Sequence, residues 1–170
     1  MSTRPTLLNG CGMAATAAEA RFRISGPTPP ARSTRIIALD RGAAALVTRA
    51  AGQRWQGARF FTYEPGSPDV DGDGGPPEII LRAADGSRAA LSDVLAGADM
   101  TVMVATAEDG AQAALAIGER CARLGIMTTG LVFGEGRAAA VVSVLRRHVR
   151  VLVVSGDEDD VPELLTALRA

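Results

Sequence analysis

Charged side chains that could bind a ligand or move protons follow apolar runs of strand length. Asp40 and Arg41 follow one such run, Glu108 follows a second and Asp157 follows a third. If these runs are parallel strands, their carboxyl ends meet at one edge of a sheet, where such sheets bind ligands. Carboxylates and an arginine could there line a crevice for a phosphate or another small polar molecule. The sequence therefore predicts a polar crevice at the ends of the strands.

Residue types that are missing exclude several classes of chemistry. All 18 basic residues are arginines, which excludes a P-loop lysine, a Schiff-base lysine and a lysine base. The single histidine is His148, which excludes sites built from several histidines. Cys11 and Cys121 form no Cys-x-x-Cys pair, so we expect neither a disulfide framework nor structural zinc, and we expect a reducing cytoplasm. A net charge of −1 without a basic block predicts no nucleic-acid partner.

Two acidic stretches resemble cation sites but also have simpler interpretations. Residues 69–74 match the opening of an EF-hand loop, but Ile80 stands at the twelfth position and two prolines block the following helix. A solvated acidic turn is expected there. The acidic run over 157–160 precedes a helix, so capping is the first interpretation and magnesium binding is the alternative. No dedicated metal site is therefore assigned.

Three further residues have structural interpretations. Cys121 falls in an Ala-rich amphipathic segment and is expected in the core rather than as a nucleophile. His148 ends a predicted helix, where a cation suits the helix dipole and no catalytic role is needed. Trp55 follows a helix end and is either a core residue or an interface anchor.

The 170 residues predict one α/β domain over 34–170, preceded by a flexible N-terminal tail over 1–33. The tail lacks the apolar core of a secretory signal, and we expect no membrane-spanning run. From residue 34, apolar runs alternate with amphipathic segments, which is typical of a parallel sheet covered on both faces. We expect strands over 35–39, 59–63, 78–82, 100–106, 126–133 and 149–154, helices over 42–52, 92–96, 109–124, 136–148 and 161–168, and a loop over 64–77.

Four segments carry a family resemblance. They are residues 35–49 (RIIALDRGAAALVTR), 94–105 (VLAGADMTVMVA), 123–132 (RLGIMTTGLV) and 149–157. The first resembles the first strand, glycine loop and helix of the nucleotide-binding domain of FtsZ, the bacterial tubulin-like cell-division GTPase. The others resemble its "VLKGADMVFV" strand, its "LGILTVGVV" strand and the strand before its central helix. This resemblance implies a Rossmann-like three-layer α/β fold with a mostly parallel sheet, of the FtsZ/tubulin N-domain type.

The loops that hold phosphate in that family are changed in this sequence. The family's GGGTGTG loop closes backbone N–H groups on phosphates, whereas the matching residues 106–113, TAEDGAQA, keep one glycine. Glu108 and Asp109 put carboxylates where phosphates would lie, so we expect the chain to fill the anion site with its own side chains. Asp157 stands where the family has one of its guanine-reading asparagines. The resemblance thus implies a degenerate nucleotide crevice formed by Asp40, Arg41, Gly42, Thr106, Glu108, Asp109, Gly110 and Asp157.

The changed loops predict a protein without GTP hydrolysis. The family's water-activating acidic residues come from the C-terminal domain of a neighbouring subunit, so we assign no catalytic residue. We expect a cytoplasmic binding or scaffolding module that acts through protein contacts, as a homodimer or an accessory subunit. No cofactor is expected beyond weak GTP or GDP binding, and no membrane partner. Two alternatives stay open: a GTP-binding switch or GTPase completed by a partner chain, and an enzyme that uses the strand-end crevice for another small molecule.

Overall fold

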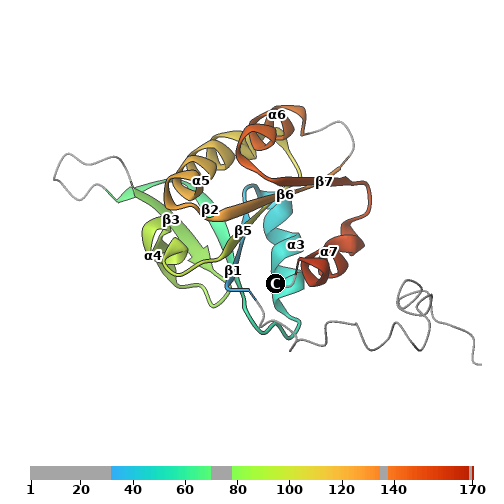
Figure 1. Ribbon diagram of the computed structural model, residues 1–170, viewed down its shortest axis with the longest axis horizontal. Helices are drawn as coiled ribbons and strands as arrows, with labels where there is room; N and C mark the ends of the chain where they lie inside the picture. The colour runs from blue at the N-terminus through green and yellow to red at the C-terminus, as the bar shows by residue number, and fades with distance from the viewer. Residues whose placement is uncertain (1–31, 70–77, 135–137, 169) are drawn as a thin grey trace, which may run out of the picture. The chain divides into compact units, whose positions relative to one another are not determined.

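The computed structural model describes residues 32–69, 78–134, 138–168 and 170, in which strands and helices alternate except where β2, β3 and β4 follow one another (Figure 1). The predicted tail lies outside these residues except for Arg32 and Ser33, and the EF-hand-like stretch lies outside them from residue 70 on. The strands are β1 (Thr34–Ala38), β2 (Ala58–Asp69), β3 (Glu78–Ala83), β4 (Arg88–Ala90), β5 (Met100–Ala105), β6 (Met127–Phe133) and β7 (Val151–Ser155). The helices are α3 (Arg41–Ala51), α4 (Leu91–Leu95), α5 (Ala111–Leu124), α6 (Ala139–His148) and α7 (Val161–Ala167), with 3-10 turns η2 (Glu108–Gly110) and η3 (Glu158–Asp160).

Within the described residues, one sheet has seven strands in the order β4-β3-β2-β1-β5-β6-β7. β2, β1, β5, β6 and β7 are parallel to one another, whereas β3 is antiparallel to β2 and β4 is antiparallel to β3. Ile36 of β1 pairs with Phe60 of β2 and with Val102 of β5. The expected fold class is confirmed: a Rossmann-like three-layer α/β fold with a mostly parallel sheet.

Alternating side chains of the strands build an apolar layer on each face of the sheet. Ile37 and Met103 pack with side chains of α4, α5 and α6, whereas Ile36 and Val102 pack with side chains of α3 and α7 on the other face (Figure 1). All four side chains are fully buried. Because successive strand residues point to opposite faces, the apolar residues of β1 and β5 contribute to both layers. The helices therefore cover both faces, and loops occupy the carboxyl ends of the parallel strands.

Two elements at the β4 side of the sheet differ from the sequence prediction. The loop expected over 64–77 begins as strand, because β2 continues to Asp69 and, after an irregular step, Pro68 and Asp69 pair with β3. The β1–β2 pairing ends at Ala38, so among the described residues this extension has no partner on the β1 side, and such an edge tolerates proline. β4 was not expected, since a three-residue strand is too short to show alternation.

The remaining expected elements occur with shifted ends. The helix expected from Asp109 begins as the 3-10 turn η2 and becomes α-helical at Ala111. Pro162 lies in the first turn of α7, as predicted. In the part of the chain that the structure describes, no helix combines the length and the apolar character needed to cross a membrane.

Candidate functional site

The carboxyl ends of β1 and β5 are the place where this sheet would be expected to bind a ligand. β1 leads through α3 to β2 on one side, whereas β5 leads through α5 to β6 on the other side. In doubly wound sheets, such a change of direction leaves a crevice between the two strand ends. Here the crevice would lie between the β1–α3 loop, which contains Asp40, and the β5–η2 loop, which contains Thr106.

The carboxylate of Asp40 lies between these two loops. Its Oδ1 accepts hydrogen bonds from the backbone N–H of Ala43, at 2.8 Å, and from the hydroxyl of Thr106, at 2.6 Å. Its Oδ2 accepts hydrogen bonds from the backbone N–H groups of Thr106 and Ala107, at 2.6 and 3.1 Å. Asp40 is also the N-cap of α3, where the helix dipole favours negative charge. With 6% of its surface exposed and four donors, it takes the position that this helix N-terminus would offer to a phosphate.

Two glycines let the loops pack closely around this carboxylate. A Cβ atom on Gly42 would lie 2.1 Å from Oγ1 of Thr106, and a Cβ atom on Gly110 would lie 2.9 Å from Cβ of Leu39. Both distances are shorter than real contacts of a Cβ atom, so each neighbour restricts its position to glycine. The packed loops and the Asp40 carboxylate therefore meet between the ends of β1 and β5.

The carboxylates expected at the phosphate position lie elsewhere. Glu108 and Asp109 are exposed on η2, and neither side chain caps η2 or α5. The backbone N–H groups of Thr106 and Ala107, which come first in the loop, point instead to Asp40. The side chain that fills the anion position between the loops is therefore Asp40, and not Glu108 or Asp109 as we expected.

A cleft of about 590 Å³, which Asp40 helps to line, lies between the ends of β1 and β2. Arg41 and Asp109, both named by the sequence, line this cleft. Asp40 and a threonine also line it. The other charged or hydroxyl-bearing lining residues are Tyr63, Glu64 and Arg88, which we did not expect at a site. The cleft is therefore formed by the loop after β1, the start of α3, β2, β4 and the turn η2.

Glu64, which lines this cleft, forms ion pairs with two arginines. One carboxylate oxygen pairs with Arg82, and the other lies 3.0 Å from a guanidinium nitrogen of Arg88. Thr62 pairs with Arg82 and Arg82 with Arg88 across β2, β3 and β4, and Glu64 follows Thr62 by two residues on the same strand. Period-two alternation then places all three charges on one face of the sheet. Only this strand pairing reveals the ion pairs, since the three residues are far apart in sequence.

Asp157 is not among the residues that line the cleft, although we expected it in the same crevice. Asp157 follows β7, and β5 and β6 lie between β7 and β1 in the sheet. Asp157 is the N-cap of η3 and accepts the backbone N–H of Asp159 at 2.9 Å. Asp160 accepts the hydroxyl of Ser155 at 2.7 Å. These contacts bear out capping for the turn η3 but not for α7, whose N-cap Asp160 makes no side-chain capping hydrogen bond.

The other candidate residues have structural surroundings. Across the described residues, no group of three or more His, Cys, Asp or Glu side chains is arranged to hold a metal ion. Cys121 is buried, and burial raises the pKa of its thiol, which disfavours the nucleophilic thiolate. His148 ends α6 and packs against Gly118, where a Cβ atom would lie 2.7 Å from that of His148. Trp55 packs against Phe60 with ring centroids 5.9 Å apart, so it contributes to the core.

Neither a protein-family model nor a curated protein matches this sequence. The resemblance to FtsZ therefore stays a prediction made from the residues, while the α/β fold is established by the sheet and its helices.

Proposed function

We propose that this chain is a degenerate FtsZ-like domain that does not hydrolyse nucleotide and acts through protein contacts, as a scaffold or an accessory subunit. One observation carries the proposal: the Asp40 carboxylate fills the anion position between α3 and the loop that follows β5. The exposed outer edge of β7 supports a role in protein contacts, because Val151 and Val154 are exposed there.

Asp40 competes with a bound phosphate in two ways. Its charge lies where a phosphate would put its own, and the two would repel each other. Its oxygens also use the backbone N–H groups of Ala43, Thr106 and Ala107, which are the donors that a phosphate would need. Hydrogen bonds to a charged group contribute about 1.5–3 kcal/mol each. A nucleotide would therefore have to displace a well-bonded side chain before it could bind.

Thermal unfolding of the full chain with millimolar GTP or GDP, with and without magnesium, tests this proposal. We expect an unchanged Tm. A ligand present at 100 times its Kd would add about 2.7 kcal/mol to the free energy of unfolding, which is a rise of several degrees. Such a rise would contradict the proposal and favour the GTP-binding switch completed by a partner chain.

A matched pair of variants tests the anion position directly. Asp40→Gly removes the buried carboxylate, whereas Asp109→Gly removes an exposed one two residues after Ala107. We expect Asp40→Gly to lower the Tm, and we expect inorganic phosphate to restore part of the loss, since it can accept the N–H groups that Asp40 leaves. Phosphate should leave the Tm of Asp109→Gly unchanged. An equal effect of phosphate on both variants would show that the position has no special affinity for anions.

A second candidate function is small-molecule binding in the cleft beside Asp40. Its volume of about 590 Å³ lies in the range of ligand pockets, about 300–1,000 Å³. Arg41 and Tyr63 would supply a charge and a hydroxyl to a carboxylate or phosphate compound. A thermal-shift screen of such compounds tests this candidate, with Arg41→Ala and the exposed Arg54→Ala as matched variants. A stabilising compound whose effect is lost only in Arg41→Ala would support it, and a screen without stabilising compounds would count against it.

A further inference from the structure

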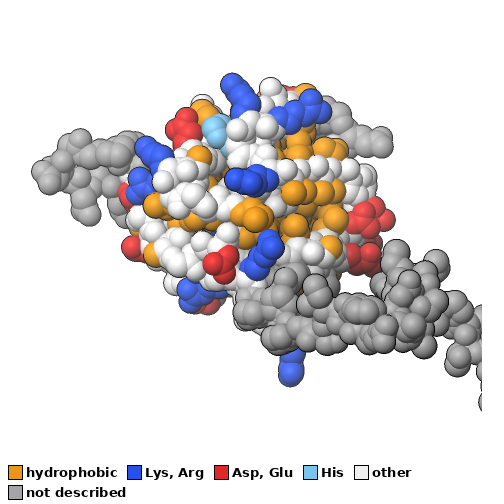
Figure 2. All heavy atoms as spheres, viewed as in Figure 1, with side chains coloured by type: hydrophobic (Ala, Val, Ile, Leu, Met, Phe, Trp, Pro, Cys, Tyr) orange, Lys and Arg blue, Asp and Glu red, His pale blue; other side chains and the backbone are white. Residues whose placement is uncertain are grey.

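β7 is the last strand on one side of the sheet, and its outer edge pairs with no strand among the described residues. Its five residues, VLVVS, include no charge and no proline, which are common devices against edge-to-edge pairing. Val151 and Val154 have 44% and 58% of their surface exposed. Figure 2 shows apolar side chains gathered on this side of the molecule. Within the part of the chain that the structure describes, the edge is therefore open both to backbone pairing and to burial of apolar surface.

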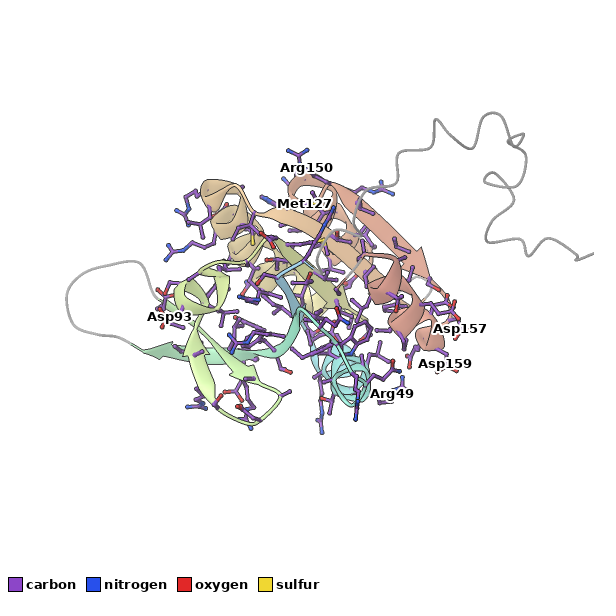
Figure 3. All side chains as sticks on the ribbon, turned by 60° about the horizontal axis from the view of Figure 1, so that its bottom comes forward. Arg49, Asp93, Met127, Arg150, Asp157 and Asp159 are labelled. Atoms are coloured by element: carbon purple, nitrogen blue, oxygen red, sulfur yellow. The ribbon has the colours of Figure 1, made fainter. Side chains whose placement is uncertain are left out.

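Opposite charges lie at the two ends of this strand. Arg150 precedes β7, and Arg146 and Arg147 lie in the last turn of α6 just before it. Asp157 and Asp159, both exposed, follow β7. In Figure 3, Arg150 lies at one end of the strand and the two aspartates lie at the other. The edge thus has a positive beginning, an apolar middle and a negative end.

We propose that this edge binds the β7 edge of a second copy of the chain in antiparallel orientation. The inference rests on the proposed function, since it names the protein contact. A two-fold axis brings the same surface of both copies together. Antiparallel pairing then sets the Arg150 end of each strand against the acidic end of the other, whereas parallel pairing would bring like charges together at both ends. Val151 and Val154 of each copy become covered where the two sheets join.

Sedimentation equilibrium of the full chain over a range of concentrations tests this pairing. We expect a reversible dimer whose Kd rises with salt, because salt screens exposed charges. Arg150→Glu and Asp159→Arg should each raise the Kd by about tenfold or more, because each reversal brings like charges together twice per dimer. Arg54→Glu and Asp93→Arg make the same charge changes on exposed residues away from β7 and should leave the Kd unchanged (Figure 3 labels Asp93).

Mixing the two reversed variants gives a sharper test. In a mixed dimer, the reversed charge at position 150 meets the reversed charge at position 159, and the native Arg150 and Asp159 meet at the other end. The equimolar mixture should therefore dimerise with a Kd close to that of the unchanged chain, although each variant alone does not. Asp159 is the acidic residue to change, because Asp157 caps η3. Far-UV circular dichroism and Tm confirm that each variant is folded.

Each outcome decides for or against this pairing. A chain that stays monomeric overturns the proposed pairing. A dimer whose Kd is unchanged by both charge reversals, or is not restored when the two variants are mixed, also overturns it. A monomer whose Tm does not respond to GTP leaves the proposed function standing with a different protein partner. A dimer that meets the charge tests but gains stability from GTP would overturn the proposed function and keep the edge pairing.

Discussion

Asp40 accepts both the hydroxyl and the backbone N–H of Thr106, each at 2.6 Å and each on a different carboxylate oxygen. These bonds join the loop after β1 to the loop after β5, and the two strands are neighbours in the sheet. The strand ends are therefore held together at the point where doubly wound proteins open to a ligand. In this chain, the residues at that position connect two loops and stabilise the fold.

Asp40→Ala should lower the free energy of unfolding by about 2–4 kcal/mol, as measured by urea denaturation. The variant removes the N-cap of α3 and leaves the backbone N–H groups of Ala43, Thr106 and Ala107 without their acceptor. Asp109→Ala is the control, because this exposed carboxylate caps neither η2 nor α5, and its effect should be below about 0.5 kcal/mol. Equal effects of the two changes would contradict the role assigned to Asp40.

Gly42→Ala should destabilise the chain by about 1–3 kcal/mol, because the new Cβ atom would lie 2.1 Å from Oγ1 of Thr106. Thr106→Ala removes that oxygen and loses one hydrogen bond to the Asp40 carboxylate, which contributes about 1.5–3 kcal/mol. The double variant should therefore be less destabilised than the sum of the two single changes. Urea denaturation of all four proteins gives the coupling energy. Additive losses would show that the two residues do not clash.

The order of strands and helices is predictable from this sequence because of a local pattern. β1, β5 and β6 are mostly apolar and almost entirely buried, as expected for strands covered on both faces, and amphipathic helices follow them. β4 and the extension of β2 carry no such pattern. Their strand structure depends on pairing with β3, which local sequence does not reveal.

The site was only partly predictable for a related reason. Asp40 and Arg41 follow an apolar run, so their place at a strand end can be read from the sequence. Asp40 faces the loop after β5 because β1 and β5 are paired in the sheet, and this pairing cannot be read from the local sequence. Glu108 and Asp109 stand out as charges in a changed loop, but the 3-10 turn leaves them exposed. The ion pairs of Glu64 with Arg82 and Arg88 become visible only when the pairing of β2, β3 and β4 is known.

Arg35→Met should weaken the attachment of α4 and lower the free energy of unfolding by about 1–3 kcal/mol. Arg35 is buried in β1, where its Nε donates to the carbonyl of Val94 at 2.7 Å and its guanidinium also reaches Ser33 and the carbonyl of Ala96. Methionine fills the space but donates no hydrogen bond. Hydrogen exchange of α4 amides should therefore accelerate. Arg59→Met is the control, because Arg59 is exposed and pairs with Arg35 across β1 and β2. It should leave the exchange of the α4 amides unchanged.

The buried thiol of Cys121 predicts a loss of stability at alkaline pH. Burial raises the pKa of this thiol, although a hydrogen bond to Thr101 acts in the opposite direction. As pH rises past the ordinary thiol pKa, about 8.5, the unfolded chain loses the proton while the folded chain keeps it. The free energy of unfolding should then fall by up to about 1.4 kcal/mol per pH unit until the folded thiol also ionises. Urea denaturation from pH 7 to 10, in a Cys11→Ser background, should show a steeper alkaline decline with Cys121 than with Cys121→Ala. Parallel curves would mean that the thiol has the same pKa in both states.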